Sequence, residues 1–315
     1  MPALPVRSGR VCGSAAALAL ALAGTFSAER ASAQDFADAR IETQQLGEGL
    51  YVLFGVGEGV IAGNMLVSIG SDGTLVVDSQ FPEMVPKYSR TIADLGGGEI
   101  EIVINTHWHF DHADGNKVLG PRGATIIAHD NARRMLMHDN VINLVTQTIE
   151  QPRFDDDAQP ALSYGSRMNV HFNGEPIRLM HAGPAHTLGD TAVIFSSHNV
   201  VHLGDVFNTS GYPFIDADNG GSLNGIIDFC AAVLEVVPRT AIVVPGHGPV
   251  SDYQGLRDYV AMLSEIRDRL SALISSGATL EQVVAAQITA EWDASNGDPT
   301  MLLDRAYASM LGGRD

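Results

Sequence analysis

Short apolar runs bounded by turn residues predict β-strands in the first part of the chain. Two strands are expected within residues 41–55, on either side of a turn at residues 47–49. A hairpin is expected from residues 60–69 and 74–79, because Ser71-Asp72-Gly73 between them is a strong turn signal. Two further short apolar runs predict strands at residues 101–105 and 124–128.

The second part of the chain repeats this strand-rich pattern and then becomes helical. Strands are predicted at residues 168–172, 177–181, 192–195, 200–203 and 241–244, after a polar, irregular stretch at 151–160. Helical spacing marks residues 81–95, 131–140, 222–237, 251–275 and 299–310. Ser222 is expected to cap one helix, and Thr279 with Gln282 forms the signature of a capping box at the start of another.

The order of these elements predicts the fold class. Two strand-rich halves, each followed by helices, suggest two sheets packed face to face between helical layers, an α+β protein with an αββα sandwich. No low-complexity linker divides the halves. We therefore expect residues 34–315 to form one large domain with a helical C-terminal tail.

The first 33 residues have the pattern of an export signal. Arg7 and Arg10 precede an apolar core at residues 15–23 that is too short to span a bilayer. Ala31-Ser32-Ala33 is a typical cleavage site, so the mature chain is expected to begin at Gln34 and to be periplasmic or secreted. No later stretch is apolar for long enough to cross a membrane. Cys230 is then the only cysteine, which excludes an internal disulfide, and its apolar helical neighbours indicate a buried thiol.

Charge narrows the range of substrates. The full chain has a net charge of −18, and residues 34–315 alone carry 16 basic and 36 acidic side chains. Such a surface repels a phosphate backbone, which argues against nucleic acid as a partner. A small-molecule substrate is expected instead, and the sequence leaves the oligomeric state open.

The strongest chemical signal is His107-Trp108-His109-Phe110-Asp111-His112, directly after the apolar strand at residues 101–105. Three more ligand-type residues follow at predicted strand ends or loops beside glycine: His186, Asp205 and His247. Imidazole nitrogen and carboxylate oxygen are ligands that zinc prefers, and a catalytic zinc keeps one position open for water. Seven such residues suffice for two metal ions that share one carboxylate.

These motifs resemble those of the metallo-β-lactamase superfamily over roughly residues 41–249. The resemblance implies the same αββα sandwich, with two Zn²⁺ at one edge between the sheets. It implies that the first zinc is held by His107, His109 and His186, the second by Asp111, His112 and His247, and that Asp205 bridges them. It further places Asp78 beneath the site, where we expect this residue to hydrogen-bond a ligand histidine. The catalytic residues would be Asp111, which orients the nucleophile, together with His107 and His109.

Two positions depart from the β-lactamases whose bridging position is a cysteine. Asp205 stands where those enzymes have the cysteine, as in the family's glyoxalase II and lactonase branches. Asn208 stands where they have a lysine that binds the substrate carboxylate. Residues 55–63, in contrast, are similar to the flap of the β-lactamases.

The resemblance leaves three functions open. The first is an exported dizinc hydrolase in which hydroxide formed on the metals attacks a cyclic amide or ester, with β-lactams as the best-motivated substrates. The second is a lactonase or thioesterase, and the third is a metal-bearing binding protein without turnover. Several other side chains keep two interpretations: Trp108, Phe110, Tyr212 and Phe214 as pocket walls or core, and His181 and His202 as support for ligands or as ordinary buried histidines. The remaining histidines, His129, His138, His171 and His198, are expected to be structural.

Overall fold

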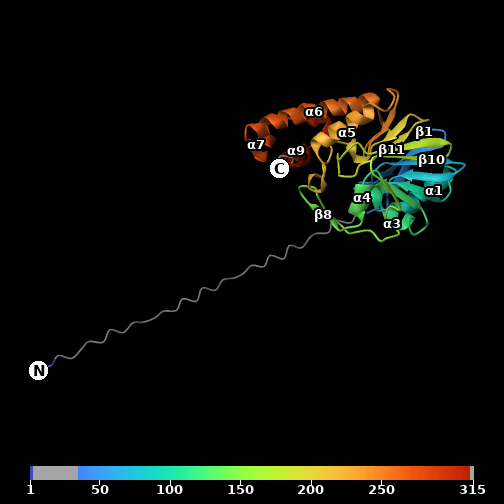
Figure 1. Cartoon of the computed structure of the whole chain (residues 1–315), viewed down its shortest axis with the longest axis horizontal. Helices are drawn as coiled ribbons and strands as arrows, with labels where there is room; N and C mark the ends of the chain where they lie inside the picture. Colours follow the sequence, from blue (N-terminus) through green and yellow to red (C-terminus); the bar gives the residue numbers. More distant parts are fainter. Residues whose placement is uncertain (3–34, 313–315) are drawn as a thin grey trace.

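The computed structural model describes residues 1–2 and 35–312. The predicted export segment therefore lies outside the described residues, apart from its first two. The described part forms two large sheets and a small hairpin, with helices on the outer faces (Figure 1). In this part of the chain no helix is long and apolar enough to cross a membrane.

The first sheet has seven strands in the order β1-β2-β3-β4-β5-β6-β9. Strands β1 to β4 are joined by antiparallel pairing, and β4, β5, β6 and β9 run parallel to one another. Its bounds are β1 (Arg40–Gly47), β2 (Leu50–Val56), β3 (Met65–Gly70), β4 (Gly73–Val77), β5 (Ile100–Ile104), β6 (Thr125–His129) and β9 (Leu162–Tyr164). Helix α1 (Val85–Asp94) connects β4 to β5, as parallel pairing requires a crossover.

The second sheet has six strands in the order β10 to β15. Its bounds are β10 (Arg167–Phe172), β11 (Glu175–Met180), β12 (Ala192–Phe195), β13 (Val200–His202), β14 (Ile242–Val244) and β15 (Ser251–Asp252). Only β13 and β14 are parallel, and α5 (Leu223–Leu234) lies between them in sequence. The tail comprises α6 (Tyr253–Ser275), α7 (Leu280–Ala285), α8 (Asp293–Asn296) and α9 (Thr300–Gly312).

Alternating side chains build the layers. Leu75 and Val77 of β4 point into a core between the sheets, where Phe195 and Val244 of the second sheet join them. Val76, between the first two in sequence, belongs instead to a cluster with α1 on the outer face. A third cluster packs the second sheet against α5, α6 and α9. Because each fully buried aliphatic side chain stabilises the fold by roughly 1.5–3 kcal/mol, these three clusters hold the four layers together. The predicted αββα sandwich is confirmed.

Most predicted elements are present, with shifted ends. The capping box of Thr279 and Gln282 forms, and Ser222 accepts a hydrogen bond from the backbone N–H of Gly225 as the cap of α5. The strand expected from residue 60 begins only at Met65. The helix expected at residues 131–140 ends at Leu136 as α4 (Asp130–Leu136).

Several short elements of the structure were not predicted from the sequence. One is a hairpin of β7 (Asn140–Asn143) and β8 (Thr148–Gln151). Neither strand has more than two consecutive apolar residues, so no apolar run marks them in the sequence. Two single-turn helices, α2 (Phe110–Ala113) and α3 (Asn116–Leu119), were also missed.

Candidate metal centre

Strand ends bring the seven predicted ligands together. The carboxyl ends of the parallel neighbours β4 and β5 lie at one edge of the first sheet, and those of β13 and β14 lie at one edge of the second. His107 and His109 follow β5, and α2 adds Asp111 and His112. The second sheet contributes His186 from the β11–β12 loop, Asp205 from a short 3-10 turn after β13, and His247 after β14.

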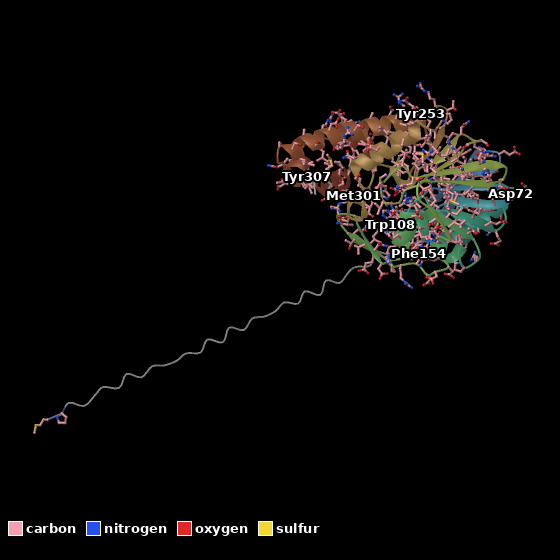
Figure 2. The ribbon with its side chains drawn as sticks, in the orientation of Figure 1. Asp72, Trp108, Phe154, Tyr253, Met301 and Tyr307 are labelled. Carbon is pink, nitrogen blue, oxygen red and sulfur yellow. The ribbon has the colours of Figure 1, made fainter. Side chains whose placement is uncertain are left out.

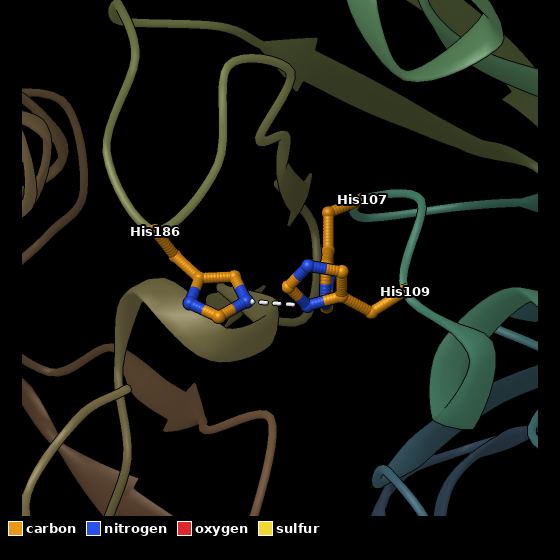
Figure 3. A group of neighbouring side chains, drawn as sticks. All are labelled: His107, His109 and His186. Carbon is orange, nitrogen blue, oxygen red and sulfur yellow. Dashed lines mark hydrogen bonds between the residues drawn. The ribbon is translucent and has the colours of Figure 1, made fainter. Parts of the chain in front are cut away.

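The first group consists of His107, His109 and His186, all buried, with ligand atoms within 4.8 Å of one another. His186 Nε2 lies 2.9 Å from His109 Nδ1 (Figure 3). The Nε2 atom of His107 is buried and has no hydrogen-bond partner among the described residues. Three ring nitrogens thus converge on one point.

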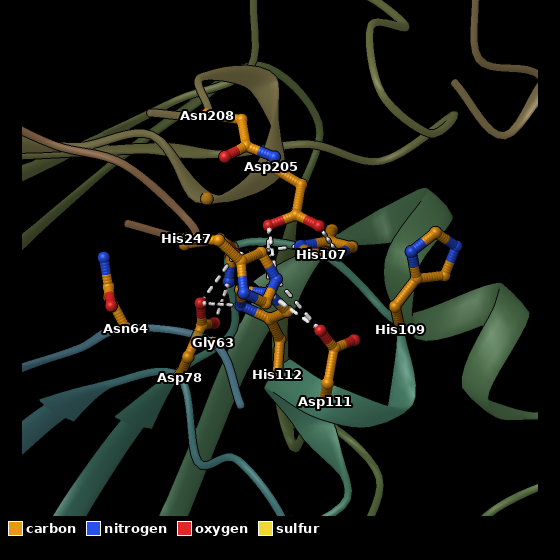
Figure 4. A network of polar contacts seen from close by, with 12 residues as sticks. Gly63, Asn64, Asp78, His107, His109, Asp111, His112, Asp205, Asn208 and His247 are labelled. Carbon is orange, nitrogen blue, oxygen red and sulfur yellow. Dashed lines mark hydrogen bonds and ion pairs between the residues drawn. The ribbon is translucent and has the colours of Figure 1, made fainter. Parts of the chain in front are cut away.

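The second group consists of Asp111, His112, Asp205 and His247, whose ligand atoms also lie within 4.8 Å of one another. His112 Nε2 is 3.0 Å from Asp205 Oδ1, and His247 Nε2 is 3.0 Å from Asp111 Oδ2. The two imidazole Nε2 atoms are 3.3 Å apart (Figure 4). All four side chains point to the same small volume.

The carboxylate of Asp205 lies between the groups. Its Oδ1 atom faces His112, while Oδ2 is 3.7 Å from His186 Nε2 and 4.0 Å from His107 Nε2. One carboxylate therefore presents one oxygen to each group, as the resemblance implied for a shared ligand.

The two groups differ in electrostatics. Burial lowers the pKa of His107 well below its usual value, and burial together with neighbouring His109 lowers the pKa of His186. Burial also acts to lower the pKa of His247, but Asp205 and Asp111 outweigh it and raise that pKa to about 9. Asp205 and Asp111 likewise raise the pKa of His112 against the effect of burial. The lowered pKa values of His107 and His186 keep these two imidazoles neutral without metal, whereas the second group holds protons that a metal must displace.

These side chains fit metal ions. A buried imidazole nitrogen without a partner, at His107, is costly unless a ligand satisfies it. The facing ring nitrogens of His186 and His109, whose lone pairs would otherwise repel, also call for a cation between them. Nitrogen and oxygen donors without sulfur suit Zn²⁺ and exclude the softest metals.

Asp78 supports the ligands, as predicted. It follows β4, and its Oδ2 atom lies 2.7 Å from His112 Nδ1. The same carboxylate accepts hydrogen bonds from the backbone N–H and the hydroxyl of Thr106, and Thr106 Oγ1 lies 3.0 Å from His107 Nδ1. A carboxylate that accepts at His112 Nδ1 leaves the Nε2 lone pair for metal. Asp78 thus orients a ligand of each group.

A second supporting carboxylate, Asp216, was missed by the sequence analysis. Its Oδ2 atom lies 2.9 Å from His109 Nε2, and the side chain is almost wholly buried. The backbone carbonyl of Phe214 accepts from His186 Nδ1 at 2.8 Å. Neither residue stands in a recognisable motif, because the loop after Asp205 reaches the first group only through the tertiary fold. An acid between the apolar Ile215 and Ala217 was the only local signal.

The surroundings of four side chains decide between the two interpretations that the sequence left for them. Trp108 is fully buried in a cluster beneath the site and belongs to the core. The Phe214 ring lies 6.0 Å from that of His109 and 5.6 Å from that of His186, so Phe214 borders the first group. His202 bonds the carbonyl of Asn64, and His181 bonds the carbonyl of Asp190, so neither bonds a predicted ligand. Cys230 is buried, as predicted.

Asn208 has a structural role in its loop. Its Oδ1 atom accepts hydrogen bonds from both the backbone N–H and the hydroxyl of Ser210, each at 2.8 Å. The amide is thereby fixed in a local turn beside His247, with which Asn208 forms an isolated parallel bridge. Among residues 1–2 and 35–312, no lysine or arginine forms a hydrogen bond or ion pair with any of the seven predicted ligands.

Comparisons with known proteins agree with this architecture. The metallo-beta-lactamase from Pontibacter korlensis has a similar fold, with a TM-score of 0.58 at 14% identity over 71% of this chain and 99% of that one. DIM-1 metallo-beta-lactamase gives a TM-score of 0.57 at 17% identity over 71% of this chain and 97% of that one. The 2,4-dinitroanisole O-demethylase subunit alpha of Nocardioides sp. (strain JS1661) is 25% identical over 144 residues, 44% of this chain and 40% of that protein's length.

A family model gives the assignment. The model described as the metallo-beta-lactamase superfamily matches residues 59–247, which is more than half of the chain and includes all seven predicted ligands. Together with the αββα sandwich and the two His/Asp groups at its edge, this match makes the chain a hydrolase of the metallo-beta-lactamase superfamily.

Proposed function

We propose that this protein is a dinuclear zinc hydrolase that opens esters or lactones without a carboxylate, using water as nucleophile. The observation that carries the dinuclear part is Asp205, whose two oxygens face the two groups. His107, His109 and His186 would hold one ion, and Asp111, His112 and His247 the other. Zinc at such a site would lower the pKa of water to about 7 and would polarise a carbonyl as a Lewis acid.

The side chains of the protein position the reaction. Asp111 is the carboxylate best placed to accept the proton of the attacking water as a general base, because it belongs to the second group and contacts His247 Nε2 through Oδ2. Asp78 and Asp216 keep His112 and His109 in the orientation that a metal ligand needs. Burial of the whole first group excludes bulk water, which strengthens every charge interaction there.

Charge at the site supports a neutral substrate. Asn208 offers only an amide, already bonded to Ser210, where a carboxylate-binding enzyme needs a cation. A hydrogen bond to a charged group contributes roughly 1.5–3 kcal/mol, against about 1 kcal/mol for a neutral pair. The acidic surface adds a long-range repulsion of anions that salt screens. The name of the O-demethylase relative gives an uncharged aryl ether as its substrate, which is not an ester but is likewise without a carboxylate.

β-Lactam hydrolysis is the second candidate. Its motivation is the predicted export signal at residues 1–33, which would deliver the enzyme to the compartment where β-lactams act. We expect this activity to be weak, with a high KM, for the charge reasons above. A metal-bearing binding protein without turnover is disfavoured, since a structural zinc needs only four closed ligands and this chain offers seven in two groups.

The test compares substrates on one metal-loaded preparation. A neutral aryl ester, a lactone, 2,4-dinitroanisole and a chromogenic cephalosporin are assayed beside elemental analysis of bound metal. We expect two zinc ions per chain and a higher kcat/KM for the neutral ester or lactone than for the cephalosporin. His171→Ala, in an exposed position of β10, serves as the control variant. Fewer than two ions in fully active protein would refute the dinuclear site, and a micromolar KM for the cephalosporin would reverse the order of substrates.

Fractionation of cells that express the full chain tests the proposed localisation. We expect the mature protein outside the cytoplasm, with an N-terminus at Gln34. A full-length protein that stays in the cytoplasm would remove the motivation for β-lactams while leaving the hydrolase proposal intact.

A further inference from the structure

The C-terminal helices lie outside the part of the chain that defines the family. The family model ends at residue 247, before α6 begins at Tyr253. In Figure 1, α6, α7 and α9 gather beside α5 at one end of the molecule. Helix α9 nevertheless packs against the 3-10 turn Ala217–Asn219, which directly follows Asp216. The tail therefore reaches the support of the first metal group.

The contacts between the tail and this region are polar and specific. We call residues 212–222 the 212–222 loop. At its start, Tyr212 donates its hydroxyl to Asp293 Oδ1 at 2.9 Å and its backbone N–H to the carbonyl of Asn296 at 3.3 Å. In its middle, Asp218 Oδ2 accepts from Arg305 Nη1 of α9 at 3.0 Å. Two parts of the tail, around α8 and in α9, thus hold the loop at two points.

Arg305 is built into this position. Its side chain is 11% exposed, and Asp304 Oδ1 accepts hydrogen bonds from its Nε and Nη2 atoms. Asp218 Oδ2 also accepts from Asn143 Nδ2 of β7 at 2.9 Å. A nearly buried guanidinium with a fixed fork geometry therefore joins α9 to the loop and, through Asp218, to the β7–β8 hairpin.

The loop in turn fixes two ligands of the first group. Asp216 contacts His109 Nε2, and its backbone N–H donates to the carbonyl of His186 at 3.0 Å. Phe214 accepts from His186 Nδ1. Asn219 Nδ2 donates to both carboxylate oxygens of Asp216, at 2.9 and 3.0 Å, and so sets the rotation of that carboxylate. Asp218, held by Arg305, stands between Asp216 and Asn219 in sequence.

We propose that the C-terminal helices are part of the support of the metal centre, and that Arg305 is a positioning residue for the first metal group, acting through the 212–222 loop. This inference rests on the proposed function, because it assumes that His107, His109 and His186 hold a metal. The second group is held differently, since His112 contacts Asp78 after β4 and no tail residue contacts Asp78, Asp111 or His112 among the described residues. A defect in the tail should therefore distinguish the two groups.

The metal-free full chain is titrated with Zn²⁺ in competition with a chromophoric chelator to measure affinity. In a separate titration with Co²⁺, the absorption of the Co²⁺ bound at each site is recorded. We expect Arg305→Gln to weaken the first group about tenfold, at the lower end of the range for residues that support ligands, and to change the second less than twofold. Arg305→Lys keeps the charge but not the fork, and should recover only part of the loss. In an Asp216→Asn background, Arg305→Gln should add little, because its effect passes through the loop that carries Asp216.

Arg269→Gln is the matched control, because Arg269 joins α6 to Glu291 and the carbonyl of Ile288 within the tail and, among the described residues, forms no hydrogen bond or ion pair with the 212–222 loop. It should leave both groups within twofold of the wild type. Should Arg305→Gln fail to fold, Tyr212→Phe removes only the hydroxyl contacts at the start of the loop and should weaken the first group alone. Equal weakening of both groups, or wild-type affinity in the variant tested, would overturn the inference. A wild-type chain that binds no zinc would overturn the proposed function as well.

Discussion

Replacement of Asp78 by asparagine should remove a proton acceptor from the metal centre with little change in shape. Asp78 has a φ of 64°, in the left-handed region that asparagine adopts more readily than most residues, so the backbone need not move. The amide oxygen must keep the hydrogen bond from the rigid backbone N–H of Thr106. The amide NH₂ then replaces the oxygen that faces His112 Nδ1, 2.7 Å away.

The consequence is a change of tautomer. A donor opposite His112 Nδ1 forces that nitrogen to accept and moves the imidazole proton to Nε2, which removes the lone pair that the second metal needs. A hydrogen bond to a charged acceptor contributes roughly 1.5–3 kcal/mol, and 1.4 kcal/mol is tenfold in affinity. We therefore expect roughly 10- to 100-fold weaker Zn²⁺ binding at the second group. A smaller loss of Zn²⁺ affinity is expected at the first group, which contains His107, because the Thr106 hydroxyl between Asp78 and His107 can rotate.

The assay is competitive Zn²⁺ titration of the metal-free variant, with thermal unfolding as a check of the fold. Asp72→Asn is a suitable control, because Asp72 also accepts a backbone hydrogen bond, from Asn173, at an exposed turn far in sequence from the ligands. If Asp78→Asn binds two zinc ions with affinities within threefold of the wild type, the tautomer argument is wrong.

Three further predictions follow from the same geometry. Asp205→Ala should lower the occupancy of both metals, because one carboxylate faces both groups, whereas His247→Ala should deplete mainly the second metal. Elemental analysis after dialysis separates these outcomes, and an Asp205→Ala variant with two tightly bound ions would contradict the bridging role. Asn208→Lys should lower the KM for anionic β-lactams and leave the KM for neutral esters nearly unchanged, although it removes the turn contact with Ser210. Steady-state kinetics on both substrates test this, and an unchanged KM for the anionic substrates would show that another group binds the carboxylate. Because carboxylates raise the pKa of His247 to about 9, this ligand is protonated at neutral pH without metal, and a metal must displace the proton. Release of the His247 proton should contribute about a tenfold rise in affinity at the second group per pH unit from pH 7 to near pH 9, beside the contribution of His112, and calorimetric titration in buffers of different ionisation enthalpy should detect the released protons.

The sequence by itself predicted the candidate metal ligands and the order of the layers. His107, His109, Asp111 and His112 stand in one short motif after an apolar strand, so their type and spacing were sufficient to predict a metal group. Short apolar runs such as β4 and β12 identified the strands, and the caps at Ser222 and Thr279 identified helix starts, because these signals depend on neighbours within a few residues.

Only the tertiary structure decided what supports those ligands. Asp216 touches His109 across 107 positions of sequence, and Arg305 touches Asp218 across 87. Contacts at such separations depend on how the loop after β13 and the tail pack, which no local pattern specifies. The β7–β8 hairpin was missed for a related reason: strands of four residues gain their stability from neighbours such as the turn Ala217–Asn219 rather than from their own alternation. Local chemistry therefore selects the ligands, whereas long-range packing sets their orientation.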